Sequence, residues 1–338
     1  MVNVGIIGYG RIGAEHAGWI DACGSARVAA VADATPARRQ RAAERGLRVV
    51  DDVDDLLSDA SVDAVLIAVP TAMHFQLALR AIARGKHVMI EKPMAVDLAQ
   101  SGQLAAEAAR RGLVLSVFHN RRWDVDYLTV QRTIASGVLG RLINVESRLG
   151  QFASCVGPAA TEYRPNWRNE AAFGGGGLYD WGSHFVDQLW RLLLPARPVR
   201  VFAQLRSNVW SADCDDFARV VIDFDNGVAG LVEVNTTTAR PLPRWHLDGT
   251  AGSASAPANA AFDTRAWAQL QFTPANGRDT RDLPVAEPGL TETMIWDRFA
   301  TAMRGGREPA VLVDSVLPTM QLLDAARASA KTGQAVVL

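Results

Sequence analysis

The sequence predicts an α/β protein in two parts: a doubly wound parallel sheet, then an α+β unit with a largely antiparallel, open sheet. Three observations predict this class. Apolar strand-like segments alternate with helix-like ones up to about residue 120, which is typical of a parallel sheet covered on both faces. A glycine-rich turn joins the first strand to the first helix. After residue 120, strand-like runs follow one another, and 338 residues are enough for two domains.

In the first unit, residues 1–120, we expect strands and helices in strict alternation. The predicted strands are Val2–Ile7, Arg27–Ala32, Leu47–Val50, Asp63–Val69, His87–Ile90 and Leu113–Phe118. The predicted helices are Arg11–Ala22, Ala37–Arg45, Asp51–Ser58, Met73–Arg84 and Leu98–Arg111. Thr35-Pro36 is typical of a helix start, because proline is favoured at the first helical position.

In the second unit, residues 121–338, the pattern changes. We expect helices over Tyr127–Ser136, Trp181–Leu193, Thr291–Met303 and Ser315–Ala330. The predicted strands are Leu142–Leu149, Val199–Arg206, Phe217–Phe224, Val228–Val234, Trp245–Leu247 and Ala266–Phe272. Asp225-Asn226-Gly227 indicates a hairpin. Residues 150–177 are expected to be irregular, and Ala251–Ala260 to form a loop.

Composition excludes several classes of protein. The formal net charge of −1 gives no electrostatic footprint for nucleic acid or an anionic membrane surface. Three widely spaced cysteines have no metal-ligand spacing and fit a reducing compartment. No apolar run approaches the roughly 20 residues of a spanning helix. We therefore expect a cytoplasmic protein without a bound metal.

The glycine turn has the spacing G-x-G-x-x-G at Gly8, Gly10 and Gly13. It follows an apolar strand and opens a helix, which is the context of a Rossmann dinucleotide site. Asp33, at the end of the second predicted strand, is placed to accept hydrogen bonds from ribose hydroxyls and to repel a 2′-phosphate. The sequence therefore favours NAD over NADP. Arg38 and Arg39 could contact a phosphate, or could lie on a solvated helix face.

Two further stretches contain candidate catalytic residues. Glu91-Lys92-Pro93 ends a parallel strand, at the edge where ligands bind, and Lys92 could hold a substrate hydroxyl there. Gly174–Gly177 precede Asp180 and His184, which are one turn apart on a predicted helix, with Asp187 and Arg191 continuing the polar stripe. A histidine can take the proton of an alcohol while hydride leaves its carbon. A surface lysine and a structural histidine are the alternatives.

Arginines stand beside aromatic residues in Arg121-Arg122-Trp123-Asp124 and in the stretch from Tyr163-Arg164 to Trp167-Arg168. Such pairs suit polyhydroxyl or carboxylate ligands. They are equally compatible with packing at the junction of the two units.

In these motifs the chain resembles the glucose–fructose oxidoreductase / inositol dehydrogenase / MocA (Gfo/Idh/MocA) family. The matching pieces are the glycine turn, Val69-Pro70-Thr71 with His74, Gly85-Lys86-His87-Val88 leading to Glu91-Lys92-Pro93, and Asp180 with His184. The stretch from Phe118 to Asp124 is most similar to the scyllo-inositol dehydrogenase branch. That branch tends to use NADP and lacks an acid at the position of Asp33, where this chain departs from it.

The resemblance implies roles for individual residues. Lys92, Asp180 and His184 match the family's catalytic positions. The expected cofactor contacts are Gly8, Tyr9, Gly10, Arg11, Ile12, Gly13, Asp33, Arg38, Val69, Pro70, Thr71, His74, Glu91, Lys92 and Asn120. The expected substrate contacts are Lys92, Arg121, Trp123, Trp167, Arg168, Asp180 and His184.

The resemblance also implies a function: NAD(P)-dependent oxidation of a secondary hydroxyl of a cyclitol or sugar. It implies a small-molecule polyol or sugar as partner and a homodimer or homotetramer. Two alternatives remain open at this point. One is a cofactor-sensing regulator of the same fold without catalysis, and the other is a redox-neutral enzyme that recycles a bound nicotinamide.

Overall fold

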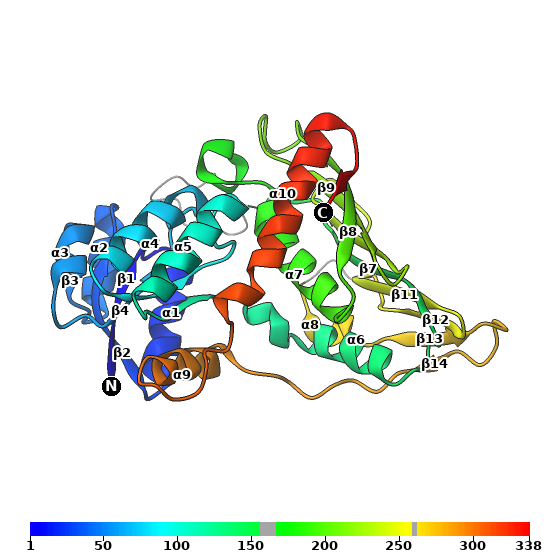
Figure 1. Ribbon diagram of the computed structural model, residues 1–338, viewed down its shortest axis with the longest axis horizontal. Coiled ribbons are helices and arrows are strands. Elements are labelled where there is room, and N and C mark those ends of the chain that lie inside the picture. The colour runs from blue at the N-terminus through cyan, green and yellow to red at the C-terminus, as the bar shows by residue number, and fades with distance from the viewer. Residues whose placement is uncertain (156–166, 259–261) are drawn as a thin grey trace.

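The computed structural model describes residues 1–155, 167–258 and 262–338. Its strands form two sheets, one from each half of the chain, as Figure 1 shows. No helix in these residues is both long enough and apolar enough to cross a membrane.

The first sheet is parallel and has six strands in the order β3-β2-β1-β4-β5-β6. These are β1 Val2–Ile7, β2 Ala26–Ala32, β3 Val49–Val50, β4 Ala64–Ile67, β5 His87–Ile90 and β6 Leu115–Val117. The helices between them are α1 Arg11–Ala22, α2 Pro36–Glu44, α3 Val53–Ser58, α4 His74–Ala83 and α5 Leu98–Arg110, with a single turn η1 Thr71–Met73. The predicted doubly wound parallel sheet is confirmed.

The second sheet has nine strands in the order β14-β13-β12-β11-β7-β10-β9-β8-β15. They are β7 Leu142–Gly150, β8 Pro198–Arg206, β9 Phe217–Phe224, β10 Ala229–Asn235, β11 Trp245–Gly249, β12 Gly252–Ser255, β13 Gln271–Pro274, β14 Arg281–Asp282 and β15 Val336–Val337. Neighbours are antiparallel except for β7 and β10, which run parallel. The largely antiparallel sheet is therefore confirmed, and so is the Asp225–Gly227 hairpin between β9 and β10.

The other helices are α6 Val125–Ala135, α7 Ser183–Leu192, α8 Thr264–Trp267, α9 Glu292–Ala302 and α10 Leu317–Thr332. Single turns η2 Asn120–Trp123, η3 Trp167–Asn169, η4 Ala171–Phe173 and η6 Val313–Ser315 lie between them, and η5 Leu178–Gly182 is a π-helical turn. Helices α7 and α10 pack together on the second sheet, against β7, β8 and β10.

Helix α9 comes after β14 of the second sheet in the sequence but lies on the first unit. It packs against α1, and its Ile295, Trp296 and Phe299 share a hydrophobic cluster with Ile6 and Val31. Figure 1 shows α9 beside α1, reached by a long connection from the second sheet. The chain thus crosses three times between the units, which the alternation of elements along the sequence did not indicate.

Two local predictions were wrong. Within Ala251–Ala260, which we expected to be a loop, Gly252–Ser255 form β12, since Gly252 and Ala254 are buried while the serines between them are half-buried. Part of that stretch, residues 259 and 260, lies outside the described residues. The strand predicted over Ala266–Phe272 begins as helix α8, because the Asp263 side chain accepts hydrogen bonds from the amides of Arg265 and Ala266.

Candidate active site

The parallel strands bring three predicted cofactor residues, and one histidine that was not predicted, to one edge of the first sheet. Gly8 follows β1, Asp33 follows β2, Glu91 follows β5 and His119 lies just after β6. Since these strands are parallel, the residues after them lie along their carboxyl edge. The strand order reverses at β1, and ligands of open α/β sheets bind in the crevice at such a reversal.

The glycine turn after β1 has the conformation that its spacing predicts. Gly8 has a φ of +95°, and a Cβ on it would lie 2.4 Å from the Ala68 carbonyl oxygen. A Cβ on Gly13 would lie 2.0 Å from the Gly8 carbonyl oxygen, so only glycine allows α1 to approach β1 this closely. Gly10 is the N-cap of α1, and no side chain in the described ranges caps that end. The first amides of α1 can therefore receive an anion, which fits the pyrophosphate of a dinucleotide.

Asp33 is held in the turn by backbone amides. Its Oδ2 accepts a hydrogen bond from Tyr9 N at 2.6 Å, and its Oδ1 accepts one from Thr35 N at 2.7 Å. The Tyr9 side chain is fully buried, so Tyr9 can reach a ligand only through its backbone. Asp33 thus joins the glycine turn to the start of α2, and its contact with a ribose stays a prediction.

Two arginines of α2 surround Asp33. Arg38 Nη1 lies 3.9 Å from Asp33 Oδ2, and it would lie 3.6 Å from a Cβ on Gly10. The Arg38 side chain is only 16% exposed, so it does not lie on a solvated helix face, and its contact with a phosphate stays a prediction. Arg39 Nη1 instead donates to the Asp33 carbonyl at 2.7 Å.

The next two predicted cofactor residues open helix α1. Arg11 is exposed and pairs with Glu15 at 3.7 Å. Ile12 is half-buried.

A buried histidine joins the turns after β4 and β5. His74 Nδ1 lies 2.9 Å from the Pro93 carbonyl oxygen, and its Nε2 lies 2.9 Å from that of Val69. Burial lowers the pKa of His74, so the ring is neutral and donates to one carbonyl at a time. Val69 and Pro70 are half-buried beside it. His74 itself is 1% exposed and lies behind the surface of the site, where it positions both turns.

The two halves of the chain meet at Lys92. Its Nζ donates to the Asp180 carbonyl oxygen at 2.8 Å and to Asp180 Oδ1 at 3.2 Å. Arg168 Nε donates to the same Oδ1 at 3.3 Å. Burial alone would raise the pKa of Asp180, but the positive charges of Lys92 and Arg168 bring it below its ordinary value. Asp180 is therefore a carboxylate held by two cations.

Asp180 lies on the π-helical turn η5, which α7 continues from Ser183. We expected an ordinary helix from Trp181 with Asp180, His184, Asp187 and Arg191 in one stripe. The π turn changes the helical register before α7 begins, and such turns are frequent at functional sites. Asp180 consequently faces Lys92, and the N-cap of α7 is Gly182.

His184, in the first turn of α7, is a buried and neutral base. It is 4% exposed, and its Nδ1 has no hydrogen-bond partner among the described residues. Burial, followed by the positive charges of Lys92 and Arg121, holds the pKa of His184 well below its usual range. At pH 7 the imidazole is therefore uncharged and can accept a proton.

A second histidine, His119, packs edge-on against His184 with 5.8 Å between ring centres. Its two ring nitrogens make no hydrogen bond within the described residues, although Nδ1 lies 3.9 Å from Asp187 Oδ2. Burial lowers the pKa of His119 to about 4, so this ring is neutral as well. The reactive region thus contains two neutral imidazoles beside a Lys92–Asp180 pair.

Comparison with known proteins assigns both units to domains of one oxidoreductase family. Residues 2–119 match the family described as "Oxidoreductase family, NAD-binding Rossmann fold", and residues 127–255 match the "GFO/IDH/MocA C-terminal domain". The chain belongs to the Gfo/Idh/MocA family. Its first unit is therefore an NAD-binding Rossmann unit, which agrees with the free amides at the start of α1.

Individual relatives of this Gfo/Idh/MocA chain are moderately similar. "Inositol 2-dehydrogenase 2" of Saccharopolyspora erythraea is 33% identical over 272 residues, which cover 78% of this chain and 76% of the relative. "Uncharacterized oxidoreductase YdgJ" of Escherichia coli is 36% identical over 213 residues, 63% of this chain and 60% of its own length. The solved NAD-binding protein of Listeria innocua superposes with a TM-score of 0.88 at 29% identity, covering 99% and 96% of the two chains.

Arg121, one of the expected substrate contacts, lies against aromatic rings. Its guanidinium carbon is 4.2 Å from the centre of the Phe262 ring and 5.0 Å from that of Trp181. Arg121 Nη1 also donates to Asp124 Oδ2 at 3.0 Å. Burial raises the pKa of Asp124 to about 6, against the effect of Arg121. Flat apolar faces thus stand beside groups that can exchange hydrogen bonds with hydroxyls.

Three other predicted contacts have different surroundings. Trp123 packs against both hydrophobic clusters of the chain, which is the junction packing that we left open. Asn120 Nδ2 donates to Glu292 Oε1 of α9 at 3.2 Å. The Trp167 ring lies 4.5 Å from the Arg168 guanidinium carbon and so supports that arginine. Tyr163, Arg164, Pro165 and Asn166 lie outside the described residues.

The glycine run before η5 packs against other protein groups. A Cβ on Gly174 would lie 2.9 Å from Thr71 Cβ, and one on Gly175 would lie 2.4 Å from the Arg168 carbonyl oxygen. Gly176 has a φ of +110°, and a Cβ on it would lie 2.2 Å from Asp215 Oδ1. The run therefore lets this loop pass close to Thr71, so that Asp180 can reach Lys92.

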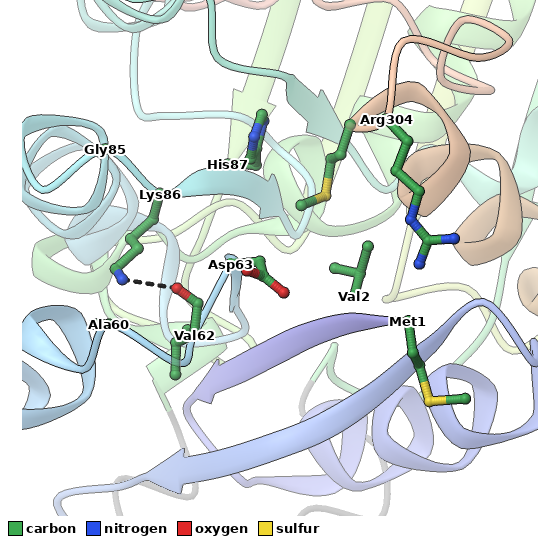
Figure 2. Close-up of a pocket in the computed structure, with 10 residues that line it drawn as sticks. Met1, Val2, Ala60, Val62, Asp63, Gly85, Lys86, His87 and Arg304 are labelled. Atoms are coloured by element: carbon green, nitrogen blue, oxygen red, sulfur yellow. Dashed lines mark hydrogen bonds between the residues drawn. The ribbon is translucent and has the colours of Figure 1, made fainter.

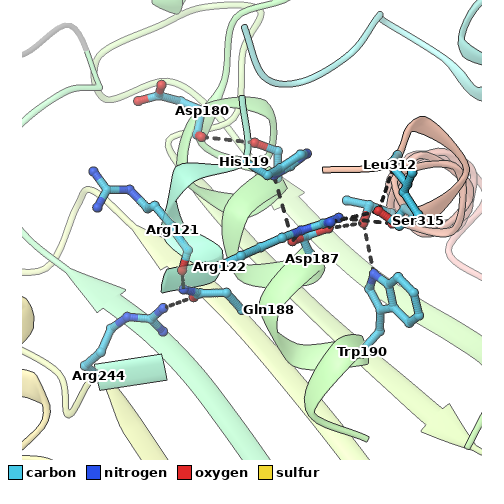
Figure 3. A network of polar contacts seen from close by, with 12 residues as sticks. His119, Arg121, Arg122, Asp180, Asp187, Gln188, Trp190, Arg244, Leu312 and Ser315 are labelled. Carbon is cyan, nitrogen blue, oxygen red and sulfur yellow. Dashed lines mark hydrogen bonds and ion pairs between the residues drawn. The ribbon is translucent and has the colours of Figure 1, made fainter. Parts of the chain in front are cut away.

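A buried ion pair behind the histidines supports the site, as Figure 3 shows. Arg122 donates to both carboxylate oxygens of Asp187, at 2.8 Å and 2.7 Å. Its Nη1 also donates to Ser315 Oγ at 2.8 Å, and Thr319 Oγ1 donates to Asp187 at 2.9 Å. Asp187 thus belongs to a buried ion pair that supports the site. The predicted polar stripe is divided, because Asp180 contacts Lys92 whereas Asp187 binds Arg122.

Lys86, from a stretch that carries the family resemblance, lies at the opposite edge of the first sheet. Figure 2 shows it at a hollow of about 440 Å³ that Met1, Asp63, His87 and Arg304 also line. Its Nζ donates to the carbonyl oxygens of Asp59 and Val62, both at 2.7 Å. Lys86 therefore holds the amino end of β4 and does not reach the cofactor edge.

Sequence reasoning missed three residues of this region: His16, His119 and Trp296. His119 could have been suggested by its place directly after a parallel strand. His16 follows the glycine turn by one helical turn, on the buried face of α1. Trp296 gave no signal, because nothing local relates α9 to α1.

Proposed function

We propose that this protein is an NAD-dependent dehydrogenase that exchanges a hydride with a carbon bearing a secondary hydroxyl, in a cyclitol or sugar. The observation that carries the proposal is the contact between Lys92, at the cofactor edge, and Asp180, on the helical segment that leads to His184. In this proposal, the contact brings a cation and a carboxylate, followed along the chain by a neutral imidazole, to the edge where NAD would bind.

A nicotinamide bound at the carboxyl edge of the first sheet would supply the acceptor for the hydride that leaves the hydroxyl-bearing carbon. The hydroxyl proton passes to His184, which burial and its cationic neighbours keep uncharged. The Lys92 ammonium stabilises the negative charge that develops on the oxygen as this proton leaves. Asp180 fixes the direction of Lys92 by accepting from it. The carbon becomes a ketone, and reduction reverses each step.

The substrate class is supported by the surroundings of Arg121 and by one relative. The Phe262 and Trp181 faces can cover the C–H side of a ring, while Arg121 and Asp124 can exchange hydrogen bonds with its hydroxyls. The similar Saccharopolyspora protein is named an inositol 2-dehydrogenase. We therefore propose a neutral polyol ring as substrate, with a homodimer or homotetramer as the active assembly.

The proposal can be tested with purified protein, NAD or NADP, and a panel of inositols, aldoses and sugar acids. We expect reduced cofactor to accumulate, seen by its absorbance, with at least one cyclitol or sugar. Binding of NADH without turnover of any of these compounds would favour a cofactor-sensing regulator. Conversion of a sugar without net absorbance change, by protein that retains its cofactor, would favour a redox-neutral enzyme.

A further inference from the structure

A chain of buried hydrogen bonds leads from helix α9 to the backbone of Lys92. Trp296 Nε1 donates to His16 Nδ1 at 2.9 Å, and His16 Nε2 lies 2.8 Å from Glu91 Oε1. The other carboxylate oxygen, Glu91 Oε2, accepts from Lys92 N at 3.1 Å. Trp296 and His16 are fully buried, and Glu91 is 9% exposed. Three segments that are distant in the sequence therefore meet at Glu91.

The indole N–H of Trp296 determines which atom donates and which accepts in each hydrogen bond of this chain. An indole N–H can only donate, so His16 Nδ1 must be the acceptor. A neutral imidazole then has its proton on Nε2, and this N–H donates to the Glu91 carboxylate. Burial alone would raise the pKa of Glu91, but the His16 hydrogen bond and the charge of Lys92 hold it below its usual range. Glu91 is therefore an anion whose orientation depends on one histidine tautomer.

Aromatic neighbours prevent the His16 ring from turning. Its centre lies 4.3 Å from that of Phe118, 4.9 Å from that of Trp19 and 5.6 Å from that of Trp296, all edge-to-face. Phe118 directly precedes His119 at the end of the neighbouring strand. The ring is thus confined between α1, α9 and the end of β6, with its Nε2 directed at the turn after β5.

We propose that His16 and Trp296 are positioning residues, which orient Glu91 and through it the backbone of Lys92. Neither residue forms a hydrogen bond or ion pair with Asp180 in the described part of the chain, so both act through the turn after β5. Helix α9 thereby sets the position of a residue that we place in catalysis, which explains why it packs on the first unit. The effect on catalysis rests on the proposed function, whereas the hydrogen-bond chain itself does not.

The first test needs no substrate. Nitrogen-15 NMR of the cofactor-free protein, with His16 assigned from a His16→Gln variant, should show a neutral ring protonated at Nε2. In Trp296→Phe, which keeps an aromatic ring but lacks the donor, the His16 signals should change toward a mixture of tautomers. Protonation at Nδ1 in the unaltered protein would overturn the proposal, whatever activity is found.

The second test separates positioning from folding. We expect Trp296→Phe to reduce kcat about tenfold and His16→Leu about 10²-fold, with NADH affinity changed much less, because a small displacement of Lys92 suffices. His16→Gln retains an N–H for Glu91 and should recover most of the loss. Trp19→Phe is the matched control, since Trp19 also packs on His16 but makes no hydrogen bond to it in the described structure.

The outcomes of these tests show separately whether the proposed function and the positioning role are correct. If the unaltered protein turns over no polyol, the function fails, while the NMR result still decides the hydrogen-bond chain. If it is active and Trp296→Phe folds with kcat within twofold of it, the positioning role is wrong. If Trp296→Phe does not fold, equal kcat values for His16→Leu and His16→Gln would contradict the proposal, and recovery in His16→Gln would support it.

Discussion

The ammonium of Lys92 is the side-chain group on which the proposed reaction depends most. Replacing it in Lys92→Ala removes the charge that stabilises the developing alkoxide, so we expect turnover to fall by about 10² or more. The glycine turn is distant from this change, and NADH affinity should stay within a few-fold of that of the unaltered protein. Steady-state kinetics and a fluorescence titration with NADH measure the two quantities.

Lys331→Ala is a suitable control for this variant, because Lys331 is an exposed lysine in the last turn of α10. Its kinetics should equal those of the unaltered protein. If Lys92→Ala also retains nearly full turnover, Lys92 has no part in the reaction.

Cofactor preference is a second property decided by single residues. Asp33 places a carboxylate at the end of β2, so we expect NAD to bind more tightly than NADP. Arg38 lies beside Asp33 and Gly10, where its charge can offset that repulsion. Arg38→Ala should therefore weaken NADP binding more than NAD binding, as parallel fluorescence titrations can show. Tighter binding of NADP than NAD to the unaltered protein would contradict the role given to Asp33.

At the scale of residues, the sequence was informative where chemistry depends on local spacing. The spacing of Gly8 and Gly13, together with the apolar strand before them and the helix after them, predicted the turn that the structure shows. Lys92, Asp180 and His184 came from motifs, but only the fold brings them together. His16 and Trp296 could not be predicted, because their hydrogen bond joins segments 280 residues apart.

At the scale of elements, the loop before η5 depends on glycine. Gly176 has a φ of +110° and would place a Cβ 2.2 Å from Asp215 Oδ1, so Gly176→Ala should cost about 2 kcal/mol or more of unfolding free energy. Gly102→Ala, in the interior of α5 with open space around it, should stabilise the protein by about 1 kcal/mol. Urea unfolding of both variants tests the contrast, and equal effects would show that the loop tolerates a side chain.

The elements that the sequence did not predict lack a strong local pattern of residues. In β12 the alternation of buried and half-buried residues is present, but Gly, Ser and Ala differ too little in hydrophobicity to reveal it. The π turn at Leu178–Gly182 arises from packing around the glycine run and from the bond to Lys92, neither of which is local. The long apolar strands and helices were predicted because their buried faces carry apolar residues at the spacing typical of a strand or a helix.

At the scale of the whole molecule, the units are joined by the return of α9 to α1 and by the contact of Lys92 with Asp180. Within the second unit, the Arg122–Asp187 pair connects the start of the unit to α7, and Ser315 and Thr319 extend it to α10. The active-site geometry thus depends on contacts between the units as well as on either sheet. Composition predicted two units, whereas these connections follow only from the three-dimensional arrangement.

Acid unfolding tests how much the Arg122–Asp187 pair stabilises the molecule. Despite burial, Arg122 and other neighbours lower the pKa of Asp187 to about 2, below the unfolded value of about 3.9. Asp187 therefore contributes about 2 kcal/mol of stability above pH 4, and this contribution is lost as the pH falls toward 2. At pH 7, Arg122→Met should cost about 3–5 kcal/mol, because it leaves a buried carboxylate without its partner. The double variant Arg122→Met/Asp187→Leu should recover most of that loss and lack this part of the acid dependence. Chemical unfolding at pH 2, 3, 4 and 7 measures both effects, and an unchanged acid dependence in the double variant would show that other carboxylates are responsible.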